Sequence, residues 1–277
     1  MNEGLLKPEA LARRETSPMK TASRALVADD LASHPDEYAL LLDIDGTLLD
    51  LAPTPREVWV PSGLVVTLRS LYERTKGALA LVSGRSLNDI DLIFAPDVFP
   101  AVGGHGAEMR LSSESEAVAT HAPPIDKELK RRLAAIAKLS PGILLEDKGY
   151  SLALHYRLAP HAEKAIYEAV SLIRADLANA PIEILPGKCV CEIKSSGFDK
   201  ATGVRELMSH APFQDRRPVF IGDDVTDESV FAVMPDLDGF AFSVGRRAQG
   251  VEGYFDAPGD VRAWLARLSD GKALSAL

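Results

Sequence analysis

The sequence predicts an α/β fold, with a Rossmann-like parallel-sheet core and an inserted α+β cap domain. Between Tyr38 and Gly104, apolar runs alternate with helical patterns in the order strand, helix, strand, helix, strand. This order is typical of a parallel sheet with right-handed crossovers. The stretch from Ser83 to Lys200 is far longer than one crossover needs, and it contains strand-like runs joined by short turns. It therefore predicts a second unit inserted into the first.

The first half of the core can be followed element by element. Residues 1–37 are polar and irregular, and we expect this N-terminal segment to be partly mobile, although a short helix is compatible with residues 8–14. Apolar runs predict strands, and side chains at helical spacing predict the helices between them. The predicted elements are a strand at 38–43, a helix from an N-cap at Ser62 to Gly77, a strand at 78–83, a helix opening at Ser86 and a strand ending at 103–104.

Residues 109–198 are predicted to form the cap, and residues 38–108 and 199–277 the core. Two amphipathic helices are expected near 126–139 and 160–179. The strand-like runs around them are AEMRL, ILLED, SLALHYR, IEIL and CVCEIK. Strands that follow one another through short turns favour an antiparallel sheet. After the cap, we expect a helix from Lys200 to about His210, strands in PVFIGDD and GFAFSVG, and a closing helix at 261–268.

Two carboxylates follow the first predicted strand. Asp43 and Asp45 come directly after YALLL, and Gly46 permits a tight turn. Asp and Gly are also common in turns without any function, so DIDGT by itself leaves both interpretations open. As a functional pair, one carboxylate can attack phosphorus while the other transfers protons, and both can hold a hard cation.

Three further segments favour the functional interpretation. SGR at 83–85 and GDDVTD at 222–227 each follow an apolar run, and Lys200 lies in GFDKA before a predicted helix. The loops that follow parallel strands meet at one edge of the sheet, where open α/β sheets bind ligands. The four segments together therefore predict a phosphate-transfer site.

Composition excludes several classes of protein. The net charge of −9 argues against general nucleic-acid binding, which requires a basic surface. No apolar stretch reaches the roughly 20 residues of a membrane span, and no secretion signal is evident, so we expect a cytoplasmic protein. Cys189 and Cys191 are spaced as buried small residues rather than as a disulfide or a zinc site. A small molecule is the expected partner, and the chain is expected to be a monomer or weak oligomer.

The four segments resemble the haloacid dehalogenase (HAD) superfamily of phosphohydrolases. DIDGT matches its first motif, Ser83 its second and Lys200 its third, while the fourth is matched by Asp223 with Asp224 and Asp227. The resemblance implies that Asp43 is the nucleophile and Asp45 the general acid and base. It also implies a Mg²⁺ ion. The implied metal ligands are Asp43, the backbone carbonyl of Asp45, and Asp223, with Asp224 and Asp227 as further candidates. Capping of the next helix is an alternative role for Asp227.

The remaining residues of the core segments have side chains or backbone groups that can bind a phosphoryl group. Ser83 can donate a hydrogen bond to a phosphoryl oxygen, and the backbone of Gly84 can approach a phosphate closely, beside Arg85. Lys200 would place a positive charge on the transition state, although a solvated surface lysine is the alternative.

In the predicted cap strands, polar and apolar residues alternate. Alternation places Ser151, His155 and Arg157 on one face of SLALHYR, and Leu152, Leu154 and Tyr156 on the other. In KCVCEIK the same argument separates a charged face from an apolar face. The charged face contains Lys188, Glu192 and Lys194 with Val190, opposite Cys189, Cys191 and Ile193. An ordinary half-exposed sheet would show the same alternation, but mixed charges also suit a sugar phosphate.

The cap segments resemble one family within the superfamily, the trehalose-6-phosphate phosphatases. The matching segments are GGHGAE at 103–108, EDKGYSLALHYR at 146–157 and GKCVCEIK at 187–194. The implied reaction is hydrolysis of trehalose 6-phosphate to trehalose and phosphate, the last step of trehalose biosynthesis. The implied substrate-binding residues are His105, Glu108, Lys148, His155, Arg157, Lys188, Glu192 and Lys194. For His105 and His155, a purely structural role is the alternative to substrate binding.

Three alternatives stay open on the sequence alone. The first keeps the chemistry and changes the substrate to sucrose 6-phosphate or a hexose phosphate. The second is a phosphomutase, which would have to retain and return the phosphoryl group. The third is a catalytically silent sugar-phosphate sensor, although a sensor has no need of both Asp43 and Asp45. Closure of the cap over the core is expected, with hinges near 106–112 and 195–199.

Overall fold

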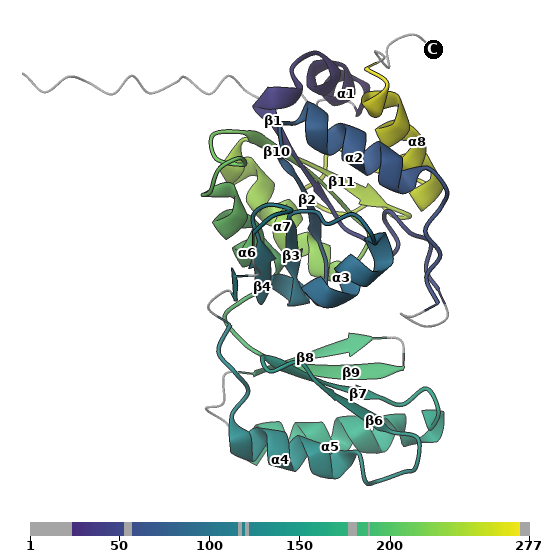
Figure 1. Ribbon diagram of the computed structural model, residues 1–277. Coiled ribbons are helices and arrows are strands. Elements are labelled where there is room, and N and C mark those ends of the chain that lie inside the picture. The colour runs from purple at the N-terminus through teal and green to yellow at the C-terminus, as the bar shows by residue number, and fades with distance from the viewer. Residues whose placement is uncertain are drawn as a thin grey trace, which may run out of the picture.

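The structure, a computed structural model, describes residues 24–52, 57–115, 118–119, 122–176, 182–187 and 189–271 (Figure 1). The helix considered at 8–14 lies outside the described residues, as does Lys188. In Figure 1 a large unit of helices around a sheet stands above a smaller unit, and two chain segments join them. The mixed α/β architecture predicted from the sequence is confirmed.

An eight-stranded sheet forms the centre of the large unit. Its spatial order is β12-β11-β10-β1-β2-β3-β4-β5, and the strands from β12 to β3 are parallel. The antiparallel strands β4 and β5 extend one edge. The strands are β1 (Tyr38–Leu42), β2 (Leu79–Val82), β3 (Ala101–Gly103), β4 (Glu108–Arg110), β5 (Val118–Ala119), β10 (Arg217–Gly222), β11 (Phe240–Val244) and β12 (Gly253–Phe255).

Helices cover both faces of this sheet. On one face pack α1 (Arg24–Ser33), α2 (Leu64–Arg74), α3 (Leu87–Phe94) and α8 (Pro258–Ser269), and on the other α6 (Lys200–Met208) and α7 (Glu228–Val233). Short 3₁₀ turns complete the large unit: η1 (Pro35–Glu37), η2 (Gly104–Gly106), η4 (Val225–Asp227) and η5 (Met234–Leu237). Two covered faces explain why the parallel strands are continuous apolar runs.

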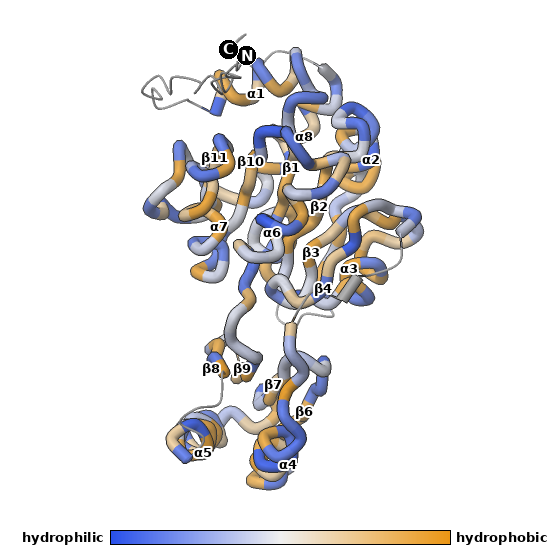
Figure 2. Tube along the Cα trace, turned by 90° about the vertical axis from the view of Figure 1, so that its left-hand side faces the viewer, coloured by the Kyte–Doolittle hydropathy of each residue, from blue (hydrophilic) through white to orange (hydrophobic). Residues whose placement is uncertain are grey.

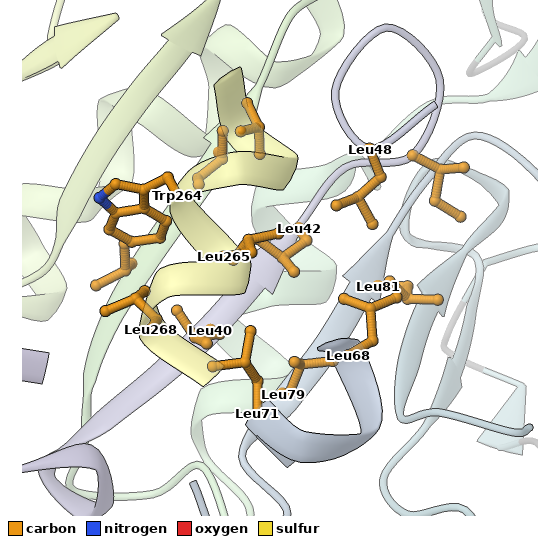
Figure 3. Packing of buried hydrophobic residues seen from close by; sticks show 14 of the residues in the cluster. Leu40, Leu42, Leu48, Leu68, Leu71, Leu79, Leu81, Trp264, Leu265 and Leu268 are labelled. Carbon is orange, nitrogen blue, oxygen red and sulfur yellow. The ribbon is translucent and has the colours of Figure 1, made fainter. Parts of the chain in front are cut away.

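Strand β1 shows how the sequence divides between the two faces. Leu40 and Leu42 pack with leucines of α2 and α8, whereas Ala39 and Leu41 belong to the cluster under α6 and α7 (Figure 3). Successive strand side chains point to opposite faces, so one apolar run supplies both layers. Hydrophobic residues are accordingly concentrated along the central strands (Figure 2).

The two predicted helix caps have different outcomes. Ser86 is confirmed as the N-cap of α3, because its Oγ accepts a hydrogen bond from the Asp89 N–H at 3.2 Å. Ser62 is not the N-cap of α2. That position belongs to Gly63, whose φ of +89° is accessible to glycine, and the Leu64 N–H closes a turn onto the Pro61 carbonyl. A backbone turn therefore replaces the expected hydroxyl cap.

The smaller unit is a four-stranded antiparallel sheet with helices on one face. The sheet order is β6-β7-β9-β8, as the short connections predicted. Its elements are β6 (Leu144–Asp147), β7 (Ser151–His155), β8 (Ile182–Gly187), β9 (Val190–Ser195), α4 (Lys127–Ile136), η3 (Pro160–Ala162) and α5 (Glu163–Asp176). In both views, which differ by a turn of 90°, the sheet lies between these helices and the large unit (Figures 1 and 2).

The alternation in the strands of the smaller unit is confirmed by its core. Leu152, Leu154 and Tyr156 pack with Cys191 and Ile193 beneath α4 and α5. The opposite face of β7 and β9, which contains Ser151 and Glu192, is consequently the face turned toward the large unit. Both cysteines are free thiols.

One strand lies in a different unit from the one expected. AEMRL was expected among the cap strands, but β4 pairs with β3, and Met109 is buried in the core under α6. The expected first hinge at 106–112 therefore falls within the large sheet. The two joining segments lie side by side near Pro123 and Ser195, where the Ser195 hydroxyl donates to the Pro123 carbonyl at 2.8 Å. We propose that the cap begins after residue 119 rather than at 109.

Throughout the part of the chain that the structure describes, no helix has both the length and the hydrophobicity needed to cross a membrane.

Candidate active site

The site forms where the strand order reverses. After β1 the chain proceeds to β2 on one side, whereas β10 lies on the other side, so a crevice opens between the carboxyl ends of β1 and β10. Asp43 follows β1, and its N–H donates to the Ile221 carbonyl of β10 at 3.0 Å. Asp223 follows β10 directly. The topology thus brings together two carboxylates separated by 180 positions (223 − 43) in the chain.

Lys200 joins the first, third and fourth segments. Its Nζ lies 2.8 Å from Asp43 Oδ1 and 2.7 Å from Asp227 Oδ1, and all three side chains are almost completely buried. The lysine stands at the first position of α6, whose N-cap is Asp199. A solvated surface lysine is thereby excluded, because the ammonium lies between two buried carboxylates.

Burial and charge act against each other in this triad. Burial raises the pKa of the Asp43 carboxyl, while the neighbouring Lys200 ammonium opposes the rise. Burial alone would lower the pKa of Lys200, but the Asp43 and Asp227 carboxylates outweigh it and raise that pKa. Lys200 is therefore a permanent cation beside Asp43.

Asp223 has the features of a cation ligand. Its Oδ1 is buried and has no hydrogen-bond partner among the described residues, an arrangement that is costly for a carboxylate unless a cation completes it. Burial raises the pKa of Asp223 to about 6, and the Asp227 and Asp224 carboxylates add to the rise. Oxygens of Asp43, Asp223 and Asp227 all lie within 4.8 Å of one another. This donor set suits Mg²⁺, which prefers a few carboxylates together with water and phosphate oxygens.

The glycine of DIDGT is required by this packing. Gly46 has φ +81°, and a Cβ on it would lie 2.0 Å from Asp223 Oδ2. Only glycine leaves room for the Asp223 carboxylate against the first loop.

The other two carboxylates of the fourth segment have structural partners. Asp227 Oδ1 accepts from Lys200, and its Oδ2 accepts from the N–H groups of Asp223 and Asp224 at 3.0 Å each. Asp224 is exposed and caps η4 by accepting from the Val225 N–H. Asp227 therefore holds Lys200 and shapes the loop, so Asp43 and Asp223 are the better candidate ligands.

Asp45 and Arg85 form a bidentate ion pair. The Arg85 Nε lies 2.5 Å from Asp45 Oδ2, and Nη2 lies 2.6 Å from Oδ1. Ser83 is buried and accepts from the Arg85 N–H, so its hydroxyl proton can be donated elsewhere. The second segment thus lies against the first, with Arg85 holding both oxygens of the candidate acid and base.

His105 connects the second segment to the cap. Its backbone has φ +56°, and its ring lies so close to Gly84 that a Cβ there would be 2.4 Å from Nε2. Burial lowers the pKa of the imidazole to about 4, against the opposing effect of Glu192. The ring is therefore neutral near pH 7, and its 3.9 Å approach to Glu192 is a contact rather than an ion pair.

The cap contributes a polar cluster around Glu192. The Ser151 hydroxyl donates to Glu192 Oε1 at 2.7 Å, and Lys148 Nζ lies 3.5 Å from the same oxygen. Glu192 also contacts His105 of the core, so it links the two cap residues to the large unit. The predicted charged face of the cap is thus turned toward His105 and the candidate active site.

Four other predicted residues have hydrogen-bond or ion-pair partners, or positions, other than those of the Glu192 cluster. Lys194 Nζ contacts Glu183 at 2.9 Å and donates to the Phe198 carbonyl. His155 contacts Glu146 at 2.9 Å, and Arg157 is half-buried beyond the end of β7. Glu108 accepts from the Leu87 N–H at 2.6 Å and from the Tyr150 hydroxyl at 3.0 Å.

The structure adds residues that the motifs did not single out. Ser151 supports Glu192, and alternation had already placed it on the correct face. Arg246 donates through Nε to the Asp223 carbonyl at 3.0 Å and contacts Glu228 at 2.8 Å. No sequence signal identifies Arg246, because its position follows from β11 lying beside β10.

Known proteins resemble the chain in both sequence and structure. The family model for trehalose-phosphatases matches residues 41–253. The trehalose-6-phosphate phosphatase of Escherichia coli (strain K12) is 38% identical over 235 residues, covering 84% of this chain and 87% of that protein. A probable trehalose-phosphate phosphatase of Sinorhizobium fredii is 40% identical over 231 residues, covering 81% of this chain and 86% of that protein.

Solved structures share the fold at lower identity. The C-terminal domain of the Candida albicans trehalose-6-phosphate phosphatase superposes with a TM-score of 0.75 at 20% identity, covering 90% of this chain and 97% of that one. BT1666 from Bacteroides thetaiotaomicron, a HAD-superfamily phosphatase, superposes with a TM-score of 0.57 at 14% identity over 83% of this chain and 93% of that one. At such identities the comparison concerns the fold alone.

Proposed function

Because this chain belongs to the trehalose-phosphatase family, we propose that it hydrolyses trehalose 6-phosphate to trehalose and phosphate, with Mg²⁺ and an aspartyl-phosphate intermediate. The chain is a phosphoric monoester hydrolase of the HAD superfamily. One observation carries the proposal further: the cap cluster of Lys148, Ser151 and Glu192 contacts His105, whose ring lies against Gly84 of the second segment, next to Ser83. A charged cap face over a phosphate-transfer site suits a phosphorylated sugar.

Asp43 and Asp223 would hold the Mg²⁺ ion, together with the backbone carbonyl of Asp45. The unpartnered Asp223 oxygen and the close carboxylates are the features that fit it. When bound, the ion supplies positive charge to the phosphoryl oxygens and to Asp43, which counters the effect of burial on that carboxyl.

In the first step, an Asp43 carboxylate oxygen attacks phosphorus, and the bond from phosphorus to the sugar oxygen breaks. Asp45 gives a proton to the departing 6-hydroxyl oxygen, so trehalose leaves neutral. Arg85 must first release an Asp45 oxygen, because the bidentate pair engages both of them. Lys200 and the Ser83 hydroxyl stabilise the charge on the transferring phosphoryl group.

In the second step, a water molecule attacks the aspartyl-phosphate and gives its proton to Asp45. The bond from phosphorus to Asp43 breaks, which restores the carboxylate and releases phosphate. Lys200 holds the leaving carboxylate, because its ammonium is fixed 2.8 Å from Asp43 Oδ1 by Asp227 on its other side. Asp227 is thus a positioning residue in this proposal, and so is Asp224, which caps its loop.

A panel of phosphate esters tests the substrate. The purified chain should release phosphate from trehalose 6-phosphate with kcat/KM at least about 10²-fold above that for sucrose 6-phosphate or glucose 6-phosphate, because a site that hydrogen-bonds substrate hydroxyls discriminates strongly. Glu192→Gln should reduce this preference. Equal rates across the panel would overturn the trehalose assignment and favour a general sugar phosphatase. A complete absence of phosphate release would favour the silent sensor.

Mg²⁺ binding is expected to be measurable without turnover. Titration with Mg²⁺ should raise the Tm of the wild-type chain, because an ion that binds only the folded state stabilises it by mass action. Asp223→Asn should abolish this rise, whereas Asp224→Asn, which alters an exposed cap, should retain it. EDTA should remove phosphate release and return it when Mg²⁺ is added. Equal Tm responses in the two variants would contradict the assignment of Asp223.

A further inference from the structure

Tyr150 bridges the cap and the core. It belongs to the turn between β6 and β7 of the cap, and its hydroxyl donates to Glu108 Oε1 at the start of core strand β4. The other oxygen of Glu108 accepts from the Leu87 N–H in the first turn of α3. The core thus holds the Glu108 carboxylate rigidly, at a helix N-terminus that favours negative charge. Both carboxylate oxygens of Glu108 have partners within the protein. In this arrangement Glu108 therefore binds the cap through Tyr150 and does not bind a substrate hydroxyl.

The rest of Tyr150 is anchored at the joining segment. Its carbonyl accepts from the Ser195 N–H at 3.1 Å, and its ring packs edge-on against Phe198 at 6.1 Å between centroids. Phe198 also lies 4.3 Å from the Lys194 ammonium, which binds the Phe198 carbonyl. These contacts form a cluster of Tyr150, Lys194 and Phe198 where the chain passes back from cap to core. The hydrogen bond from Tyr150 to Glu108 therefore lies beside the joining segment.

The core surface is shaped to receive the tyrosine. Gly104 lies directly beneath the hydroxyl, and a Cβ there would be 2.2 Å from the Tyr150 oxygen. Burial and the Glu108 carboxylate raise the pKa of the phenol, so the hydroxyl keeps the proton that it donates. His105 follows Gly104 immediately, so the tyrosine stands beside the core residue that contacts Glu192.

We propose that Tyr150 is a positioning residue that locks the cap onto the core through Glu108 and thereby holds Glu192 over the catalytic loops. The consequence for substrate rests on the proposed function, whereas the locking of the cap does not. Without the hydroxyl, the cap samples open orientations in which Glu192 and Lys148 are withdrawn from the site. The substrate then has to close the cap at the expense of binding affinity, as in any equilibrium where only one conformation binds.

Tyr150→Phe tests this proposal, because it keeps the ring against Phe198 and removes only the hydroxyl. We expect KM for trehalose 6-phosphate to rise about tenfold, the effect of losing one hydrogen bond to a charged partner, with kcat within about twofold of wild type. Hydrolysis of p-nitrophenyl phosphate, which has no sugar for the cap to hold, should change by less than about twofold. The radius of gyration of the free variant should increase in small-angle scattering. Glu108→Gln should share the larger radius and the higher KM.

Tyr156→Phe is the matched control. It also removes one tyrosine hydroxyl bond to a glutamate, to Glu163 at 2.7 Å, but that bond lies wholly within the cap. This variant should keep the wild-type KM and radius. Wild-type KM and radius in Tyr150→Phe would overturn the proposal. If the wild-type chain leaves trehalose 6-phosphate intact, the proposed function fails, while the comparison of radii still decides whether Tyr150 locks the cap.

Discussion

Replacing Asp43 by asparagine should eliminate phosphate release, with kcat reduced by about 10⁴-fold or more. The amide is a far weaker nucleophile than a carboxylate, so the covalent route through an aspartyl-phosphate is lost. Phosphate release by wild type and Asp43→Asn, measured at saturating trehalose 6-phosphate and Mg²⁺, checks this expectation.

The same variant should remain folded. Lys200 keeps its second partner, Asp227, at 2.7 Å, so no buried ammonium is left unpaired. The amide also removes a carboxylate whose ionised form is penalised by burial. We therefore expect the Tm to stay within about 4 °C of wild type, the shift that about 1 kcal/mol produces in a domain of roughly 150–250 residues. Substantial residual turnover by this folded variant would contradict the role of Asp43 as nucleophile.

Lys200→Met should cost both activity and stability. Methionine has a similar length without the charge, so Asp43 and Asp227 would face each other in a buried site without their shared cation. Removing one partner from a buried ion pair destabilises a protein by about 3–5 kcal/mol. Loss of the fixed positive charge should also lower kcat by about 10²–10³-fold. Urea unfolding, followed by circular dichroism, and steady-state kinetics measure the two effects.

Lys130→Met provides the control for stability. Lys130 pairs with Asp147 at 2.9 Å, but both side chains are partly exposed to solvent, so the loss should be at most about 1 kcal/mol. Adding Asp43→Asn to Lys200→Met should recover part of the lost stability, because one of the two unpaired carboxylates disappears. Equal destabilisation by Lys130→Met and Lys200→Met would show that burial of the triad contributes nothing.

The parts of the fold that could be predicted are those with local causes. Continuous apolar runs marked the buried strands, and alternation separated the two faces of the cap sheet, because both patterns depend only on strand geometry. Ser86 could be predicted as a helix cap because its hydroxyl oxygen accepts from an N–H group only three residues further along the chain. Ser62 failed as a cap because Gly63 offered the backbone a turn that a side-chain argument does not consider.

The pairing of strands was harder to predict from the sequence. The short strand β4 joined the core sheet and not the cap sheet, because Met109 is buried beside β3. Nothing in AEMRL distinguishes an edge strand of one sheet from an edge strand of the other. For the same reason we propose that the first joining segment follows residue 119 and does not lie at 109.

The sequence alone determined the fold class, the order of the motifs and the residue types of the site, because these depend on local patterns along the chain. Only the tertiary structure decided their partners: Lys200 bridges Asp43 and Asp227, Arg85 holds Asp45, and Glu108 receives Tyr150. Such contacts join residues that are far apart in the chain. The sequence around a charged residue is the same whether its side chain is paired in the interior or solvated at the surface. Burial decides between them, since a charge removed from water requires a partner.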